Sequence, residues 1–265
     1  MAHFGVFYKC YKETSAVEYS LKQLFSIYPD CPVYLVSDGG NDFSYLEDKY
    51  PTLKCSLEND SRGWTLTSSG CDPIVHQYRT PSIHEKFYET FCTILQRIKD
   101  GVDFCSKRHI LFMEPDVLVR GELTIPLESH LLGVIPQPNI SYDAGWNKVL
   151  KGIGGSYNTI GWSWPIIFSS EAFLKAYSFA KENETTVRDL LLSDVRFGIA
   201  DDVWLPVLFG ACGYKQENNP EVAECNRNLD WKTSGHPLLH EYRAMYPNAG
   251  DPDIGRHSAE EHNSQ

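Results

Sequence analysis

The stretch RHILFMEPDVLVRG, residues 108–121, is a largely apolar run that two acids and a proline interrupt. Large apolar residues stand on both sides of the interruption, and Pro115 has no N–H to donate to a sheet ladder. The pattern therefore predicts a buried strand, a short bend and a second extended piece. Glu114 and Asp116 would then follow the carboxyl end of the first strand.

Two acids one residue apart at such a position have two interpretations. In open α/β sheets, ligands bind outside the carboxyl ends of the strands, and both carboxylates there can turn toward one hard cation. The plainer interpretation is a solvated turn, because turns collect Asp and Pro for conformational reasons. The local pattern leaves both open.

Segments typical of strands and helices alternate before this stretch. Residues 3–10 and 32–38 predict strands, and residues 15–29 between them have the spacing of an amphipathic helix. Residues 52–60 predict a third strand. The alternation predicts an α/β fold with a mostly parallel central sheet, whose carboxyl edge would hold Asp38 together with the two acids of the bend.

Residues 81–101 form the most regular helical segment. Apolar residues recur at helical spacing, and the pattern Ser82-x-x-Glu85 is a capping box. Gly101 is typical of a helix end. The sequence therefore predicts a helix that stops at Gly101, shortly before the strand that leads to Glu114.

Length and composition limit the classes of protein to which the chain can belong. A chain of 265 residues with 42% hydrophobic residues can bury a large core, and we expect one domain over residues 1–250 and a polar, flexible tail over residues 251–265. The formal net charge of −11 disfavours a nucleic-acid partner, which needs a basic face. The N-terminal residues show neither a signal-peptide pattern nor an apolar span of about 20 residues, so we expect no membrane span.

The cysteines contain no Cys-x-x-Cys pair and stand mostly in apolar segments, at positions 10, 31, 55, 71, 92, 105, 212 and 225. This pattern is typical of reduced, buried thiols. Together with the missing signal peptide, it predicts a cytoplasmic location.

The second half of the chain is rich in glycine, asparagine and aromatic residues over residues 141–170, where Trp146, Trp162 and Trp164 stand close together. Sugar rings stack their C–H faces on indole, while their hydroxyls need polar partners. The cluster therefore predicts a carbohydrate-binding surface. For any single tryptophan, ordinary core packing is the alternative, because large aromatic side chains are highly buried on average.

Asp201 and Asp202 stand at the start of an apolar helical segment. One of them is explained as a helix N-cap. The second acid is a candidate general base that deprotonates an incoming hydroxyl. Pro206 is expected near the first turn of this helix, where its missing N–H does little harm.

Two common nucleotide-binding signatures are missing from the sequence. No Gly-x-Gly-x-x-Gly follows the first predicted strand, and no Walker-type glycine loop is present, which disfavours dinucleotide oxidoreductases and P-loop enzymes. A divalent metal on Glu114 and Asp116 is another way to hold phosphate, because it offsets the charge that an acidic protein would repel.

In their order along the chain, the strand with its acid turn, the Gly/Trp-rich stretch, the Asp201-Asp202-x-x-Leu205 helix start and a later histidine resemble the GT-A fold of nucleotide-sugar glycosyltransferases. Glu114-Pro115-Asp116 stands where that family usually has Asp-x-Asp, so the first carboxylate is kept on a longer side chain. The resemblance implies a Rossmann-related αβα sandwich, with a nucleotide-sugar-binding half over residues 1–120 and an acceptor-binding half over residues 121–250.

The resemblance also implies a reaction. A sugar would pass from a nucleoside-diphosphate sugar to an acceptor hydroxyl on a glycan, with inversion at the anomeric carbon. Asp116, with Glu114 nearby, would hold Mn²⁺ or Mg²⁺ against the diphosphate. A C-terminal histidine would be a further ligand, and of His236 and His240 we favour His240.

The remaining roles follow from the same resemblance. Asp201 or Asp202 would be the catalytic base of an inverting enzyme, and we favour Asp202 because of its position next to the helix; a retaining enzyme would change that role. The nucleoside-binding part would include the following residues: Phe7, Tyr8, Lys9 and Asp38. Arg79 and Lys86 are available for phosphate, although spacing assigns neither.

Two other functions compete with this one. A sugar nucleotidyltransferase would share the α/β core and the metal-binding acids, but it should have a glycine-rich basic loop after the first strand, and YKCYKETS, residues 8–15, has lysines without glycines. A non-catalytic carbohydrate-binding protein would explain the tryptophans but not the two pairs of acids.

Overall fold

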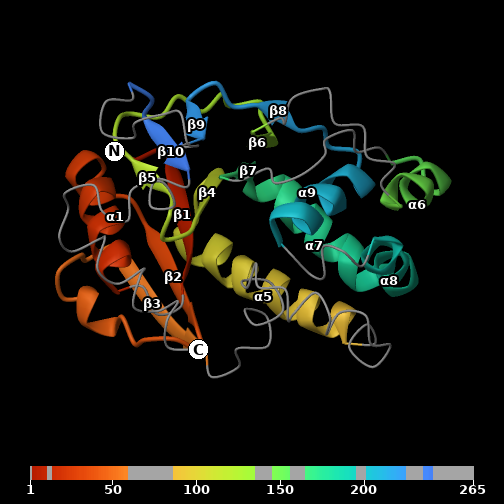
Figure 1. The fold of residues 1–265 in the computed structure, drawn as a ribbon, viewed down its shortest axis with the longest axis horizontal. Helices are drawn as coiled ribbons and strands as arrows, with labels where there is room; N and C mark the ends of the chain where they lie inside the picture. Colours follow the sequence, from red (N-terminus) through yellow and green to blue (C-terminus); the bar gives the residue numbers. More distant parts are fainter. Residues whose placement is uncertain are drawn as a thin grey trace.

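The computed structural model describes residues 2–10, 14–58, 86–134, 145–155, 165–194, 201–224 and 235–240. Over these residues the chain forms two β-sheets, with helices packed around the larger one (Figure 1). The predicted α/β class is confirmed. None of the helices in these ranges is both long enough and apolar enough to cross a membrane.

The larger sheet has the strand order β3-β2-β1-β4-β7-β6-β8. Its first four strands are parallel, β7 is antiparallel to both β4 and β6, and β6 is parallel to β8. The predicted mostly parallel sheet is confirmed, and its parallel strands end at one common edge. The bounds are β1 Phe4–Cys10, β2 Val33–Asp38, β3 Leu53–Glu58, β4 His109–Met113, β6 Leu131–Gly133, β7 Ile167–Ser169 and β8 Glu217–Asn218.

The central strand β1 is buried at every position, as expected of a parallel strand with helices on both faces. Successive side chains on it point to opposite faces. The Tyr8 hydroxyl bonds Ser20 of α1, whereas the Phe7 ring lies under Gly101 of α5. The two helices therefore cover opposite faces of the sheet, which is the predicted αβα sandwich.

The helices differ in what they cover. α5 packs against β1 and β2 with one part of its length and against α7 and α8 with another. Figure 1 shows α6, α7, α8 and α9 on the side of the molecule away from β3, with α7 running alongside α5. The bounds are α1 Thr14–Ile27, the 3₁₀ turn η1 Ser44–Leu46, α5 Phe87–Cys105, α6 Trp146–Gly152, α7 Ser170–Glu182, α8 Glu184–Ser193 and α9 Asp201–Ala211.

The end predicted for the long helix was wrong. α5 continues through Gly101 to Cys105 and ends at Ser106, which has a left-handed φ of 51°. A Cβ atom at Gly101 would lie 2.7 Å from Cδ2 of Phe7. The glycine is therefore needed because helix and strand approach closely, not because the helix stops there. The predicted capping box of residues 82–85 lies outside the described residues.

The strand, bend and second strand predicted for residues 108–121 are all present. The second piece, β5 (Leu118–Val119), pairs with β10 (Leu238–His240), which in turn pairs with β9 (Val222–Glu224). These three strands form a separate small sheet. The bend that carries Glu114 and Asp116 is therefore the corner where the chain leaves one sheet and enters the other.

One expectation about α9 needs correction. Pro206 lies inside the helix rather than near its first turn. Because proline has no N–H, it cannot donate the helical hydrogen bond to the backbone carbonyl of Asp202, four residues earlier. Among the described cysteines, the predicted burial is confirmed for Cys10, Cys31, Cys92 and Cys105.

Candidate active site

Charged side chains gather at the carboxyl edge of the parallel strands. Asp38 ends β2, Glu58 ends β3 and Glu114 follows β4. Asp38 and Glu114 share the predicted edge. The register pairs Tyr8 of β1 with Met113 of β4, so the next residues along, Lys9 and Glu114, are neighbours.

Lys9 joins two of the acids named from the sequence. Its Nζ lies 2.9 Å from Oε1 of Glu114 and 2.7 Å from Oδ2 of Asp201, the first residue of α9. The side chains of Lys9 and Asp201 are 9% and 5% exposed, and that of Glu114 is 24% exposed. We call these three residues the Lys9 triad. The triad connects β1, the bend after β4 and the start of α9.

The electrostatics of the triad are strongly coupled. Burial by itself would lower the pKa of Lys9, but the carboxylates of Asp201 and Glu114 outweigh it and raise that pKa above the usual value. Burial raises the pKa of Glu114 to about 7; the charge of Lys9 opposes the rise, and the carboxylates of Asp201 and Asp116 add to it. Lys9 therefore stays charged and offsets only part of the negative charge around it.

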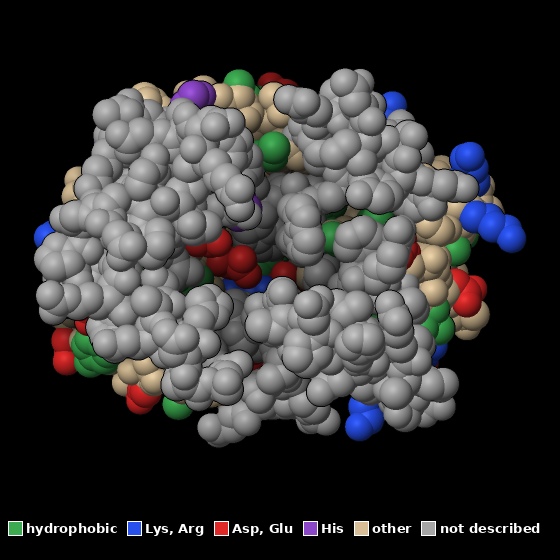
Figure 2. Space-filling view, viewed as in Figure 1, with side chains coloured by type: hydrophobic (Ala, Val, Ile, Leu, Met, Phe, Trp, Pro, Cys, Tyr) green, Lys and Arg blue, Asp and Glu red, His purple; other side chains and the backbone are tan. Residues whose placement is uncertain are grey.

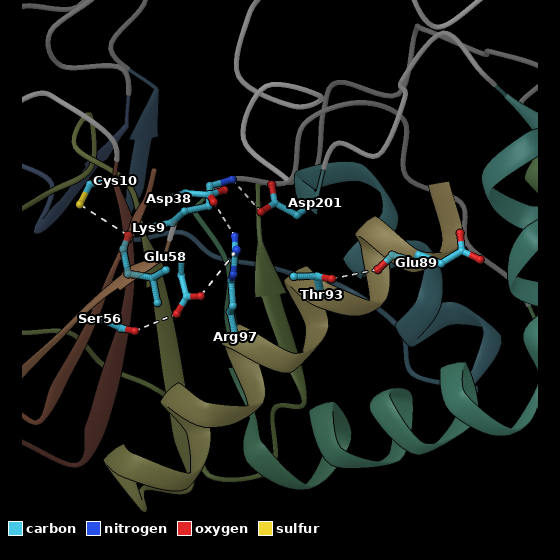
Figure 3. A network of polar contacts seen from close by, with 10 residues as sticks. Lys9, Cys10, Asp38, Ser56, Glu58, Glu89, Thr93, Arg97 and Asp201 are labelled. Carbon is cyan, nitrogen blue, oxygen red and sulfur yellow. Dashed lines mark hydrogen bonds and ion pairs between the residues drawn. The ribbon is translucent and has the colours of Figure 1, made fainter. Parts of the chain in front are cut away.

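A second ion-pair network adjoins the triad. Nη1 of Arg97, on α5, lies 2.5 Å from Oδ1 of Asp38, and its Nη2 lies 3.8 Å from Oε2 of Glu58. Figure 3 shows Arg97 reaching from α5 toward both acids, with the hydrogen bond between Lys9 and Asp201 drawn next to Asp38. Burial raises the pKa of Asp38, although the charge of Arg97 opposes this rise.

Sequence reasoning overlooked Arg97. The sequence contained a signal for it, because Arg97 stands between Ile94 and Ile98, at helical spacing from Gly101, on the apolar stripe of the helix. A charged residue on a buried helix face needs a partner. Arg97 is 8% exposed, and its partners are the acids at the ends of β2 and β3.

Two of the predicted donor-binding residues belong to the core. Phe7 is 2% exposed and packs edge-to-face on Phe112, and Tyr8 is fully buried with its hydroxyl on Ser20. Both are covered because helices pack on the two faces of β1. Of the residues predicted on this strand, only Lys9 reaches the site.

Neither of the two residues predicted to be available for phosphate, Lys86 and Arg79, is among the described residues at the strand edge where Arg97 lies. Lys86 is exposed and immediately precedes α5. It stands eleven positions before Arg97, which places its backbone about 16 Å away along the helix axis. The structure therefore does not bring Lys86 to the edge where Arg97 lies. Arg79 lies outside the described residues.

Trp146 does not form an exposed platform for sugars. It is 1% exposed, and its ring packs edge-to-face on Trp204 of α9 with 5.4 Å between ring centroids. The prediction that Trp146 contacts the acceptor was therefore wrong, since a ring buried in the core has no face free for a sugar. Trp162 and Trp164 lie outside the described residues.

Asp116 has different surroundings from Glu114. It is half-buried, and its buried Oδ1 atom has no hydrogen-bond partner within the described ranges. The β10–β5 register pairs Leu239 with Leu118, so the next residue along, His240, lies beside Val117 and close to Asp116 in the backbone. His240 is 8% exposed. Because the two strands are antiparallel, His236 lies at their opposite end and is exposed.

These residues fit a metal ion only in part. Over the ranges that the structure describes, no three His, Cys, Asp or Glu side chains gather closely enough to hold one. Asp116 has a buried oxygen available, and His240 lies near it. The predicted ligand Glu114 fits less well, because Lys9 already occupies its carboxylate.

The two acids at the start of α9 are distinguished by Lys9. Asp201 is 3% exposed and accepts the short hydrogen bond from Lys9. Asp202 follows it in the first turn of α9, and its side chain lies outside the described part. Figure 2 shows a hollow in the middle of this face of the molecule, with acidic and basic side chains visible inside it.

Comparison with known proteins shows the fold. No family model and no protein of curated function matches the sequence. The galactosyltransferase LgtC, in complex with donor and acceptor sugar analogues, superposes with a TM-score of 0.52 and 11% identity over 89% of this chain and 86% of LgtC. An active-site variant of LgtC gives a TM-score of 0.53 and 13% identity over the same shares.

The glycosyltransferase GlyE of Streptococcus pneumoniae TIGR4 superposes with a TM-score of 0.46 and 13% identity, over 90% of this chain and 55% of GlyE. At such identities the likeness concerns the arrangement of strands and helices. The mostly parallel sheet and the superposition on LgtC together show that the chain has the GT-A glycosyltransferase fold.

Proposed function

We propose that this protein is a glycosyltransferase that moves a sugar from a nucleoside-diphosphate sugar to a hydroxyl of a carbohydrate acceptor. The observation that carries the proposal is the gathering of the Lys9 triad and the Arg97 network at the carboxyl edge of a GT-A sheet. Ligands of open α/β sheets bind outside this edge. LgtC, which superposes on this chain, is a galactosyltransferase bound to donor and acceptor sugar analogues.

The proposed reaction is a displacement at the anomeric carbon. The bond from that carbon to the phosphate oxygen breaks, and its electron pair leaves with the nucleoside diphosphate. A new bond forms to the acceptor oxygen, whose proton passes to a base. Asp202 is the proposed base because Asp201, the other candidate, is engaged by Lys9. Direct displacement with this base inverts the configuration.

The proposal includes a divalent cation. The described site sets two cations, Lys9 and Arg97, against five carboxylates, which are those of Asp38, Glu58, Glu114, Asp116 and Asp201. Such a site would repel a diphosphate unless further positive charge is present. Asp116 and His240 are the residues proposed to hold Mn²⁺ or Mg²⁺, which when bound neutralises charge on the leaving diphosphate.

The proposal also assigns the two substrates to different parts of the chain. Residues 1–120 are proposed to bind the donor and residues 121–250 the acceptor, within one catalytic unit. Trp162 and Trp164 remain the proposed acceptor platforms. A cytoplasmic location and a role in glycan biosynthesis stay predictions from the sequence.

A thermal-shift panel tests the proposal. UDP, GDP, CMP, dTDP and their sugar conjugates are added with Mn²⁺ or with a chelator. A nucleotide at about one hundred times its Kd should stabilise the protein by about 2.7 kcal/mol, only when metal is present. Asp116→Asn should lose this response, whereas the control Asp103→Asn, on the exposed end of α5, should keep it. If no nucleotide stabilises the wild-type protein, the proposal fails.

A transfer assay then separates the possible reactions. The sugar nucleotide that binds is incubated with candidate glycan acceptors, and the product is identified by mass spectrometry and its anomeric configuration by NMR. Transfer with inversion is expected. A product with retained configuration would remove the role of Asp202 as base. Synthesis of the sugar nucleotide from a nucleoside triphosphate and a sugar phosphate would instead reveal a nucleotidyltransferase.

A further inference from the structure

Lys9 is a cation shared between parts of the chain that are far apart in sequence. It stands near the end of β1, beside Glu114 in the register, and reaches Asp201, 192 positions later. Its Nζ lies within 3 Å of an oxygen of each acid, at 2.9 Å and 2.7 Å. An ammonium group has three protons to donate, so it can bond both carboxylates at once.

In this arrangement the two acids of the bend, Glu114 and Asp116, differ in how available they are to a metal ion. The carboxylate of Glu114 is already paired with a permanent cation, and a divalent ion bound to it would lie next to the like charge of Lys9. The buried Oδ1 of Asp116, in contrast, has no hydrogen-bond donor among the described residues. A cation that enters the site therefore finds its available oxygen on Asp116.

We propose that Lys9 is a positioning residue: it withdraws Glu114 from the metal's ligands and holds the start of α9 against the strand edge. The proposal rests on the function proposed above and concerns the same site. By holding Asp201, the first residue of α9, Lys9 also sets where the backbone of the next residue, Asp202, lies relative to the donor. Lys9 would act on the metal site through Glu114 and on the position of Asp202 through Asp201, without contact with the reacting atoms.

Metal binding to the protein without nucleotide or acceptor is the first test. Mn²⁺ is titrated into wild-type protein, Glu114→Gln and Asp116→Asn, and followed by calorimetry and by electron paramagnetic resonance. Glu114→Gln should keep the Kd for Mn²⁺ within about threefold, whereas Asp116→Asn should weaken it by about tenfold or more. Equal loss in both variants would overturn the proposal, because Glu114 would then be a ligand like Asp116.

Removal of the Lys9 charge gives a sharper result. In Lys9→Met the carboxylates of Glu114 and Asp201 lose their cation, so Mn²⁺ should bind about tenfold more tightly while kcat for transfer falls. The double variant Lys9→Met/Glu114→Gln should lose that gain, and Lys9→Arg, which keeps the charge, should not show it. If Lys9 had only a structural role, replacing it with Met would not increase the affinity for Mn²⁺. Unchanged or weaker Mn²⁺ binding in folded Lys9→Met would contradict the proposal.

Controls separate the possible failures. Thermal denaturation shows which variants fold; if Lys9→Met does not fold, the comparison of Glu114→Gln with Asp116→Asn decides alone. If wild-type protein binds Mn²⁺ and the nucleotide but Glu114→Gln loses the metal, only the role of Lys9 falls. If wild-type protein transfers sugar yet binds no Mn²⁺, the proposed sugar transfer survives, but its metal and this inference do not.

Discussion

Asp201 and Asp202 are adjacent in the sequence, but Asp201 is engaged by Lys9, and Asp202 is therefore the proposed base. Asp202→Asn should keep donor binding and lower kcat by about 10² to 10⁴, because a general base contributes about this factor. Asp201→Asn, in contrast, should lower the thermal stability, because it weakens the buried ion pair with Lys9. Loss of such a partner costs up to about 3–5 kcal/mol.

The donor Kd, kcat and melting temperature of both variants are the measurements for this pair. If Asp201→Asn retains wild-type stability and donor binding but loses transfer, the base is Asp201. Wild-type kcat in Asp202→Asn would remove Asp202 from the mechanism.

His109 predicts a pH dependence of stability. It is 1% exposed on β4, and its Nε2 lies 2.9 Å from the backbone carbonyl of Ser129. Burial lowers its pKa, although the hydrogen bond to Ser129 opposes this. The unfolded chain, with a pKa of about 6.5, therefore binds a proton more readily than the folded protein. The stability that this difference contributes is present above pH of about 6.5 and is lost as the pH falls through the folded pKa.

Urea unfolding at several pH values between about 7.5 and 5 measures this effect. His109→Gln can still donate to the carbonyl of Ser129 but does not titrate. The free energy of unfolding should fall less on acidification in this variant than in wild-type protein. An equal fall in both would show that other groups cause the acid sensitivity.

At the scale of elements, α5 carries Arg97 and packs against β1, β2, α7 and α8. Replacing two small residues near its C-terminal end should change the stability in opposite directions. Gly101→Ala should destabilise the protein by about 1–3 kcal/mol, because the new Cβ would lie 2.7 Å from a ring atom of Phe7. Ser106→Gly should stabilise it by about 0.5–1 kcal/mol, because Ser106 has a φ of 51°, which favours glycine.

Free energies of unfolding from urea titration distinguish these effects. Gly152→Ala is the matched control, because a Cβ there would meet nothing within 4 Å. It should change stability by no more than about 0.5 kcal/mol. If Gly101→Ala behaves like this control, then α5 does not need to approach β1 as closely as the structure indicates.

The bend after β4 shows how far an element can be predicted. Its strand, turn and second strand follow from the apolar pattern and Pro115. Its position at a corner between two sheets does not, because the partner of β5 is β10, more than a hundred residues later. The same corner places Glu114 beside Lys9 and Asp116 near His240.

For the whole molecule, the net charge of −11 predicts a response to salt. Self-repulsion of a strongly acidic protein destabilises the compact state, and salt screens it. Without metal or nucleotide, the melting temperature should therefore rise by a few degrees between about 0.05 M and 0.5 M NaCl. Repeating the scan near the isoelectric pH, where the net charge vanishes, should remove most of the rise. A melting temperature that falls with salt would contradict this view of the charge.

The sequence by itself determined the α/β class, the strands and helices of the first half and the edge of the sheet that carries the acids. These features depend on local periodicity and on the rule that parallel strands end together, and both can be read from one segment at a time. The acid at the end of β2 and the acid after β4 were placed correctly for that reason.

Only the tertiary structure decided which side chains meet. Lys9 joins Glu114 to Asp201 across 192 positions, Arg97 turns toward the ends of β2 and β3, and Trp146 enters the core against Trp204. Short strands such as β7 and β10 likewise take their partners from distant parts of the chain. The physical reason is that ion pairing and ring packing depend on distance in space, which hydrophobic periodicity along the chain does not encode.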